Sequence, residues 1–284
     1  MNYAAPRTID ETVRLLADAP GAGHVLAGGT DLVVQMTAGL RTPDLVVDIK
    51  AIPELTDLRE DDDGFHLGAA LCGAALNENA ALKSAWPGVT EAIDLIGSMQ
   101  VQSRATPAGN LCNASPAADS VPALIAANAT VTVIGPAGLR TVAVEDIPAG
   151  PGRTTLNKGE VITAIHLPRR PARSADAYIR FTPRTEMDIA VVGVAVNLTL
   201  DAQGLCTAAR VAIGAVAPTA RLVPAAGAAL IGTPLDDTAL DRAAEAVRAA
   251  CQPIDDKRGT AAYRIRIAGV IFRRAALAAL SRIS

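Results

Sequence analysis

The chain has 284 residues, of which 50% are hydrophobic and 19% charged, with a formal net charge of −3 and a pI near 5.7. This composition excludes a disordered or low-complexity protein, and the lack of clustered positive charge argues against a nucleic-acid or anionic-membrane surface. Apolar runs fall short of the roughly 18 residues that span a bilayer, and the N-terminus carries no basic and apolar leader. The sequence therefore predicts a cytoplasmic protein without nucleic-acid partner or membrane span.

Cysteine and histidine are few and scattered, with no Cys-x-x-Cys pair. The residues concerned are Cys72, Cys112, Cys206, Cys251, His24, His66 and His166. Zinc and iron–sulfur sites need closely spaced ligands of these types. We therefore expect no metal site built by this chain alone.

Strands and helices alternate irregularly through residue 100, which is typical of an α+β domain. Thr8 as N-cap with Glu11 three positions on predicts a helix start, because the two side chains can satisfy unpaired backbone N–H groups. The elements expected next are a strand at 24–27, a helix at 32–40, a strand at 45–49, a hairpin turn at 61–64 and a helical stretch from 77 to 82.

The pattern becomes strand-rich from Val121. Expected strands lie at 129–134, 140–144, 160–167, 177–181, 190–200 and 206–216, and expected helices at 240–250 and 260–280. The polar, proline-containing segment 169–174 interrupts this pattern, so we place a domain boundary there, between 1–172 and 173–284. The last helix carries Arg264, Arg266, Arg273, Arg274 and Arg282, which we expect to form a solvated face.

A first glycine-containing segment, Ala27–Leu32, lies where an expected strand meets an expected helix. Paired glycines let backbone N–H groups approach a ligand closely, and a helix start adds unpaired donors suited to a phosphate. The alternative is a tight turn in which Thr30 or Asp31 caps the helix. The segment alone leaves both interpretations open.

A second segment, Gln100–Asp119, has no helical or strand period and is rich in small and hydrogen-bonding residues. Long irregular stretches inside a domain are usually functional. Thr106, Asn110 and Ser115 offer side-chain partners, Gly109 offers close backbone approach and Asp119 offers a carboxylate, all of which suit a sugar-phosphate ligand. The alternative is an irregular surface loop.

Together, the two segments resemble the paired FAD-binding motifs of the medium, flavin-carrying subunit of the xanthine dehydrogenase and carbon monoxide dehydrogenase family of molybdenum hydroxylases. The motifs lie roughly seventy residues apart, as in the family, and the likeness continues through 151–160 and 177–181 to Tyr263 and Arg264. The resemblance implies an FAD-binding domain of the vanillyl-alcohol-oxidase (PCMH) type, made of two α+β subdomains. A small α+β C-terminal domain, with about three strands and several helices, would follow.

The resemblance also implies a set of FAD contacts. In the family, the first motif wraps the FAD pyrophosphate with backbone N–H groups, and the second motif forms the opposite wall of the FAD site. Further residues reach the ribityl chain and the flavin. Carried over to this sequence, the contacts are Leu26, Ala27, Gly28, Gly29, Thr30, Asp31, Leu32, Thr106, Ala108, Gly109, Asn110, Ser115, Asp119, Ile162 and Arg180. Ala108 stands where the family usually has glycine, and Arg180 where it often has lysine. No catalytic residue is expected.

The function implied by the resemblance is electron transfer. FAD would take electrons from the [2Fe–2S] clusters of a small partner subunit and pass them to NAD⁺, a quinone or oxygen. Substrate would be oxidised at the molybdenum-pterin cofactor of a large partner subunit, in a dimer of heterotrimers. The alternatives are a self-sufficient FAD-dependent oxidase of the same superfamily and a flavin-free interaction module that keeps the fold.

Overall fold

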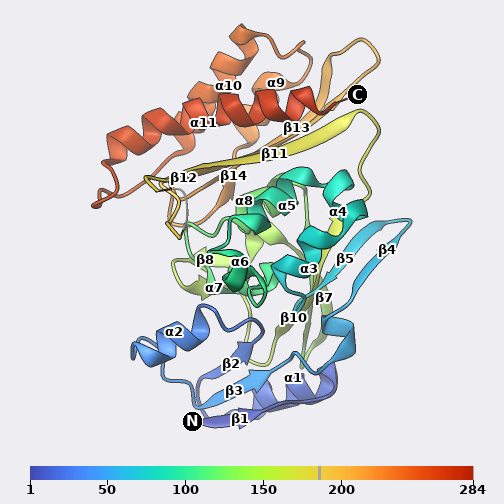
Figure 1. Ribbon diagram of the computed structural model, residues 1–284, viewed down its shortest axis with the longest axis vertical. Helices are drawn as coiled ribbons and strands as arrows, with labels where there is room; N and C mark the ends of the chain where they lie inside the picture. The colour runs from blue at the N-terminus through green and yellow to red at the C-terminus, as the bar shows by residue number, and fades with distance from the viewer. Residues whose placement is uncertain (185–186, 284) are drawn as a thin grey trace.

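The computed structural model describes residues 1–184 and 187–283. Along the long axis of the molecule, the chain runs from a small N-terminal sheet through a middle layer of sheet and helices to a C-terminal layer at the other end (Figure 1). No helix in these ranges is long and apolar enough to cross a membrane. The α+β class expected from the sequence is confirmed.

The N-terminal part is a parallel sheet with strand order β1-β3-β2, whose strands are connected by helices. Its elements are β1 (Asn2–Ala4), α1 (Ile9–Asp18), β2 (Gly23–Leu26), α2 (Leu32–Thr37) and β3 (Leu45–Asp48). The predicted start of α1 is confirmed, because the Thr8 hydroxyl accepts a hydrogen bond from the Glu11 N–H at 3.2 Å. The Glu11 carboxylate turns back to the N–H of Arg7, at 3.1 Å.

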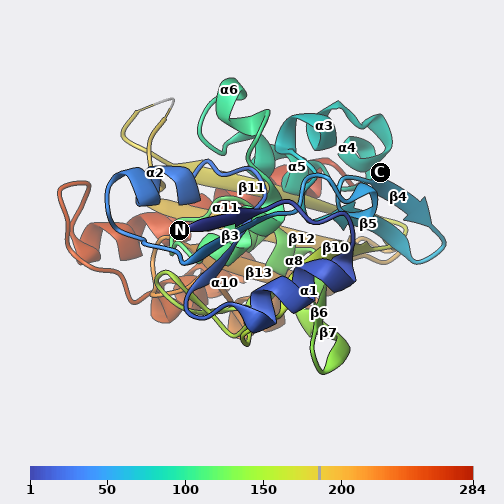
Figure 2. The same cartoon turned by 90° about the horizontal axis from the view of Figure 1, so that it is seen from below.

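The middle layer holds an antiparallel sheet with strand order β4-β5-β10-β6-β7. The strands are β4 (Leu58–Asp61), β5 (Gly64–Gly68), β6 (Thr130–Gly135), β7 (Gly138–Ala143) and β10 (Val161–Pro168). The hairpins β4–β5 and β6–β7 extend outward from the two edges (Figure 2). Both were expected from their turn residues, but the sequence left open that β10 would lie between them.

Short helices fill the space beside this sheet. They are η1 (Pro53–Leu55), α3 (Gly73–Glu78), α4 (Ala80–Ala85), α5 (Pro87–Asp94), α6 (Met99–Gln102), α7 (Pro107–Asn113) and α8 (Ser120–Ala126). Beyond them, η2 (Val144–Asp146) precedes a small hairpin of β8 (Pro148–Gly150) and β9 (Arg153–Thr154).

The prediction that residues 100–119 lack helical structure is wrong, since they include most of α6 and all of α7. Thr106 caps α7 and Pro107 occupies its first turn, where proline needs no N–H partner. The helix ends at Ala114, which is left-handed with φ 51°. So short a helix shows no sequence period, and Thr106 followed by Pro107 was the only available signal of its start. Strands also do not begin at Val121, because α8 covers residues 120–126.

The C-terminal layer is an antiparallel sheet covered on one side by helices. The strands, in order, are β11 (Ser174–Phe181), β12 (Val192–Leu200), β13 (Cys206–Gly214) and β14 (Arg221–Leu222), and the helices are α9 (Pro224–Leu230), α10 (Asp237–Ala250) and α11 (Ala261–Ser281). The sequence missed β14. The other face of the sheet packs on α5 and α8.

Alternation of side chains along the C-terminal strands explains how this sheet serves two hydrophobic cores. Tyr178 and Ala195 belong to the core of the middle layer, whereas their neighbours Ala177, Val194 and Val196 belong to the core beneath α10 and α11. Because both faces are covered, β12 is apolar along most of its length. The two layers are therefore joined by a buried sheet face.

The expectation of a solvated arginine face on α11 is wrong for Arg264, which is 4% exposed. Its guanidinium donates to the carbonyl of Val191 at 2.9 Å and pairs with Asp256 at 2.7 Å. Arg273 pairs with Asp237 and Asp241 on α10. These arginines therefore fix α11 to its neighbours, which charge spacing along one helix does not reveal.

A buried ion pair lies where the middle and C-terminal layers meet. Arg170 donates to Asp176 at 2.6 Å, and its guanidinium lies 4.0 Å from the ring centroid of Trp86, which is 2% exposed. Burial lowers the pKa of Arg170 and raises the pKa of Asp176, while each partner opposes the shift of the other. The pair therefore depends on both members being present.

We predict that Arg170→Met lowers the free energy of unfolding by about 3 kcal/mol, because it leaves Asp176 buried without this cation. Urea unfolding followed by circular dichroism measures the change. The neighbouring Arg169→Met is the control: the Arg169 side chain is 73% exposed and its partner Asp62 is fully exposed, so a change below about 0.5 kcal/mol is expected. Equal unfolding midpoints for the two variants would contradict the prediction.

Candidate functional site

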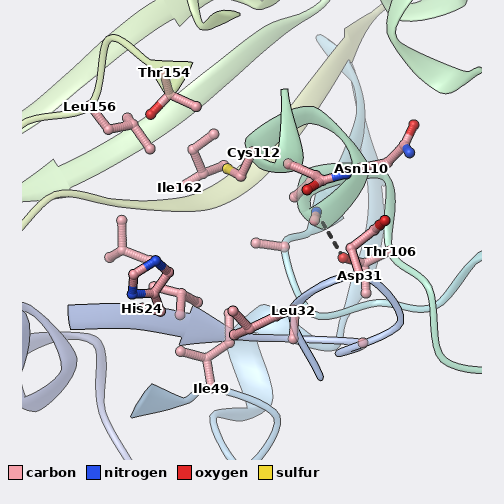
Figure 3. Close-up of a pocket in the computed structure, with 18 of the residues that line it drawn as sticks. His24, Asp31, Leu32, Ile49, Thr106, Asn110, Cys112, Thr154, Leu156 and Ile162 are labelled. Carbon is pink, nitrogen blue, oxygen red and sulfur yellow. Dashed lines mark hydrogen bonds between the residues drawn. The ribbon is translucent and has the colours of Figure 1, made fainter. Parts of the chain in front are cut away.

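A cavity of about 390 Å³ lies between the N-terminal sheet, α7 and the segment that leads into β10. Figure 3 shows His24 and Ile49 on one side, Asp31, Thr106 and Asn110 on another, and Thr154, Leu156 and Ile162 on a third. Both glycine-containing motifs contribute to its wall. Segments far apart in the sequence therefore meet at one site.

The first motif forms a sharp turn between β2 and α2. Gly29 has φ +78°, in the left-handed region that favours glycine, and a Cβ there would lie 2.9 Å from Leu26 Cδ1. A Cβ on Gly28 would lie 2.0 Å from the carbonyl oxygen of Arg104, so that glycine allows the two motifs to touch. The turn therefore needs each glycine for a different reason.

The backbone N–H groups of residues 28–32 have no hydrogen-bond acceptor among the residues that the structure describes; the first to bond back is that of Val33, to Gly29 O at 3.0 Å. Consecutive unpaired N–H groups at a helix start form an anion-binding concavity. The alternative of a simple capped turn is not what the chain forms, because Asp31 occupies the N-cap position without a side-chain cap hydrogen bond. Burial raises the pKa of Asp31.

The N-terminus of α7 forms the facing wall. The Thr106 hydroxyl accepts a hydrogen bond from the Gly109 N–H at 2.9 Å, which fixes the first turn. Ala108 is 4% exposed and lies inside the helix without a positive φ, so its Cβ is tolerated where the family usually has glycine. The Oδ1 atom of Asn110 accepts from the Ser120 hydroxyl at 2.7 Å, while its amide nitrogen has no acceptor within the described ranges.

Some predicted contacts do not line the cavity, namely Leu26, Ser115, Asp119 and Arg180. Both carboxylate oxygens of Asp119 are engaged within the chain: Oδ1 accepts from the Tyr178 hydroxyl at 2.9 Å and Oδ2 from Arg180 at 2.6 Å. Burial raises the pKa of Asp119 to about 6, although Arg180 and Tyr178 favour its ionised form. The roles of these residues as FAD contacts stay predictions.

The predicted contacts that do line the cavity are Ala27, Gly28, Gly29, Thr30, Asp31, Leu32, Thr106, Ala108, Gly109, Asn110 and Ile162. The structure therefore brings most of the two motifs, and one residue of β10, to a single surface. Whether these residues contact FAD likewise stays a prediction.

The sequence missed several polar residues on the cavity wall. Arg41 donates to Gln35 Oε1 at 2.7 Å and lies 3.0 Å from His24 Nε2, which must accept because a guanidinium can only donate. Burial and Arg41 lower the pKa of His24, which favours the neutral ring. Gln35 is the only polar residue in the segment 32–36, and this exception was the available sequence signal that it has a polar partner.

Two further ionisable residues on the wall are held in one protonation state. Burial raises the pKa of the Cys112 thiol to about 12, so it is not a thiolate nucleophile at neutral pH. At the rim, Glu160 accepts from both Nε and Nη2 of Arg140 at 2.8 Å and from the Asn157 N–H at 2.7 Å. These hydrogen bonds lower the pKa of Glu160 to about 2 despite partial burial.

The low pKa of Glu160 predicts a pH-dependent contribution to stability. A lowered carboxylate pKa stabilises the folded state above the unfolded value of about 4.5, and this contribution is lost as the pH falls toward about 2. The loss of unfolding free energy in Glu160→Gln should therefore be largest near pH 7 and shrink between pH 4.5 and pH 2. Urea unfolding at several pH values measures it.

Arg140→Met tests the cause of that effect, because Arg140 makes the largest contribution to the lowered pKa. Its stability difference from the unsubstituted protein should fade over the same pH interval. A Glu160→Gln difference that does not change between pH 7 and pH 2.5 would contradict the assignment.

Comparison with known proteins agrees with this geometry. Residues 1–170 match the FAD binding domain in molybdopterin dehydrogenase, and residues 177–279 match the CO dehydrogenase flavoprotein C-terminal domain. The carbon monoxide dehydrogenase medium chain of Afipia carboxidovorans is 34% identical over 281 residues, which cover 99% of this chain and 97% of the relative. A putative xanthine dehydrogenase FAD-binding subunit of Escherichia coli is 30% identical, covering 94% and 91%.

Solved structures give the same result. A chain of carbon monoxide dehydrogenase from Hydrogenophaga pseudoflava superposes with a TM-score of 0.96 at 33% identity, covering 100% of this chain and 98% of that one. A chain of quinoline 2-oxidoreductase from Pseudomonas putida superposes with a TM-score of 0.90 at 26% identity, covering 99% and 97%. The two-domain fold and the FAD cofactor expected from the motifs are thus confirmed. The chain belongs to the FAD-binding flavoprotein subunits of the xanthine dehydrogenase and carbon monoxide dehydrogenase family of molybdenum-containing oxidoreductases.

Proposed function

We propose that this chain is an electron-transfer subunit whose FAD takes electrons from the [2Fe–2S] clusters of a small partner subunit and passes them to an external acceptor. The observation that carries the proposal is the cradle of unpaired N–H groups at residues 28–32, which faces the N-terminus of α7 across the cavity. Two helix starts directed at one space suit a diphosphate. The domains of this proposal are 1–172, which holds FAD, and 173–284.

The residues on the wall suit both the polar pyrophosphate and ribityl part of FAD and its ring system. The N–H groups of residues 28–32 would hold the pyrophosphate, and the amide nitrogen of Asn110 would donate to a ribityl or phosphate oxygen. Apolar side chains of Ile49, Leu156 and Ile162 offer a surface for a ring system. FAD supplies the electron-accepting and electron-donating chemistry, and the protein supplies binding, orientation and electrostatics.

Three acid–base groups of the wall support electron transfer over direct substrate oxidation. His24 Nε2 is engaged by Arg41, Glu160 is paired with Arg140, and the Cys112 thiol stays protonated. A self-sufficient oxidase needs a base positioned to take a substrate proton. We therefore assign substrate oxidation to the molybdenum-pterin cofactor of a large partner subunit, in a cytoplasmic dimer of heterotrimers.

A flavin-free module that keeps the fold is the other alternative. It would have no use for a left-handed glycine turn with unpaired N–H groups, since unpaired backbone donors next to a partly apolar cavity are costly unless a ligand or water satisfies them. The cradle therefore favours a bound anionic ligand.

The first prediction from this proposal concerns Gly29. Gly29→Val should abolish stoichiometric FAD binding, because a β-branched residue opposes φ +78° and its Cβ would crowd Leu26 and Val33. The flavin absorbance of the purified protein measures binding. Gly39→Val is the matched control: Gly39 has φ +69° at the other end of α2, and a Cβ there meets nothing within 4 Å.

The two glycine variants therefore carry similar backbone strain and differ in their place relative to the cradle. FAD retained in Gly29→Val, or lost equally in both variants, would contradict the assignment of the turn as the pyrophosphate site.

The second prediction is that the isolated chain binds FAD and oxidises no organic substrate by itself. Anaerobic mixing with aldehydes, purines, N-heterocycles and carbon monoxide should leave the flavin absorbance unchanged, whereas a strong artificial donor should bleach it. Turnover should appear on adding the small iron–sulfur and large molybdenum subunits. Rapid bleaching by one of these substrates without partners would instead favour the self-sufficient oxidase.

A further inference from the structure

Helix α2 follows directly on the cradle at residues 28–32, but none of its apolar side chains is fully buried. None of its residues is buried, and Val33 and Val34 are 51% and 65% exposed. Helices this short are not stable by their own hydrogen bonds. Figure 1 places α2 at the outer edge of the molecule, beside the small parallel sheet. Gly28 touches Arg104 just before α2, and among the apolar side chains of the helix only Leu32 and Met36 are half-buried. The rest of α2 therefore depends on polar contacts for its position.

One hydrogen bond joins α2 directly to α7, which carries the facing wall. Gln35 Nε2 donates to Asn113 Oδ1 at 2.8 Å, between residues that are 78 positions apart in the sequence. Gln35 lies on the turn of α2 that follows the cradle, and Asn113 is the last residue of α7. The bond therefore fixes the distance between the two helices whose first turns face each other.

Arg41 holds Gln35 in place from the other side. Its Nε donates to Gln35 Oε1 at 2.7 Å, and the backbone N–H groups of Leu40 and Arg41 donate to the Gln35 carbonyl at 2.9 and 3.3 Å. Gln35 thus has both side-chain ends and its carbonyl oxygen occupied, which selects one rotamer and one amide orientation.

The remaining donors of Arg41 attach this arrangement to two further elements. Nη1 donates to His24 on β2 at 3.0 Å, and Nη2 donates to the carbonyl oxygen of Gly152, between β8 and β9, at 3.2 Å. Within the described ranges no carboxylate lies within 4.0 Å of Arg41, whereas Arg140, Arg170 and Arg180 each pair with one. The guanidinium of Arg41 is bonded to neutral acceptors only, which indicates that Arg41 holds other residues in position and does not pair with a charge.

We propose that Gln35, Arg41 and Asn113 form a polar clamp that positions the first FAD-binding turn against α7. These are positioning residues, and the inference rests on the proposed roles of the two walls. Removing one contact lets α2 shift outward, so that the cradle and the α7 N-terminus no longer face one diphosphate together. FAD then binds at the expense of ordering α2, which weakens its affinity.

Gln35→Ala, Asn113→Ala and the double variant test the clamp. The FAD dissociation constant, from quenching of flavin fluorescence, should rise about five- to tenfold in each single variant, the factor expected for one hydrogen bond. The double variant should be no weaker than the weaker single variant, because both substitutions remove the same bond. Gln203→Ala is the control, since that exposed glutamine lies in the distant turn between β12 and β13.

Arg41→Lys separates positioning from charge. Lysine keeps the positive charge but cannot reproduce three donors in a fixed fork. If Arg41 positions Gln35, Arg41→Lys and Arg41→Ala should weaken FAD to within about twofold of each other. Full rescue by lysine would mean that Arg41 acts by attracting the anionic ligand, which would overturn its place in the clamp.

Hydrogen exchange on the FAD-free protein gives a readout that does not depend on the cofactor. Amides of residues 33–36 should exchange faster in the clamp variants, while the thermal midpoint should stay within about 1 °C, because α2 contributes no buried side chain. Unchanged exchange and unchanged FAD affinity in Gln35→Ala and Asn113→Ala would overturn the proposal. Faster exchange in a protein that binds no FAD at all would preserve the clamp and reject the proposed function.

Discussion

The close approach of Gly28 to the backbone of Arg104 is the constraint on which the site depends. A Cβ at residue 28 would lie 2.0 Å from Arg104 O, so only glycine lets the two motifs touch. The second motif is itself anchored at this point, because the Ala105 carbonyl accepts a hydrogen bond from the Gly73 N–H at 2.8 Å. The turn before α2 and the segment leading into α7 therefore touch at Gly28, and the cavity forms beside their contact.

Behind the cavity, a chain of polar contacts links the second motif to the C-terminal layer. Asn110 is hydrogen-bonded to Ser120. The residue before Ser120, Asp119, is held by Tyr178 and Arg180, which both lie on β11. The Tyr178 hydroxyl fits because Gly193 on the neighbouring strand has no side chain; a Cβ there would lie 2.4 Å from it. The C-terminal sheet thus supports the second motif from behind, which gives a physical reason for the two domains to occur in one chain.

Ionisable side chains and backbone N–H groups contribute differently to the electrostatics of the cavity. Glu160 near the wall is paired and Cys112 is protonated, whereas the backbone N–H groups of residues 28–32 have no acceptor in the part of the chain that the structure describes. Backbone dipoles provide positive potential without a titratable group, so their contribution does not change with pH. A site of this kind suits a permanently anionic cofactor that carries the redox chemistry itself.

The sequence by itself determined the local features: the cap of α1, the two hairpins, the long C-terminal strands and both motifs, because each depends on a few neighbouring residues. The resemblance of the motifs determined the family. Only the tertiary structure decided that Asp119 pairs with Arg180, that Arg264 is buried, and that Gln35 reaches Asn113. Asp119 and Arg180 are 61 positions apart in the sequence, Val191 and Arg264 are 73 apart, and Gln35 and Asn113 are 78 apart. No periodicity or turn signal encodes which distant side chains packing will bring together.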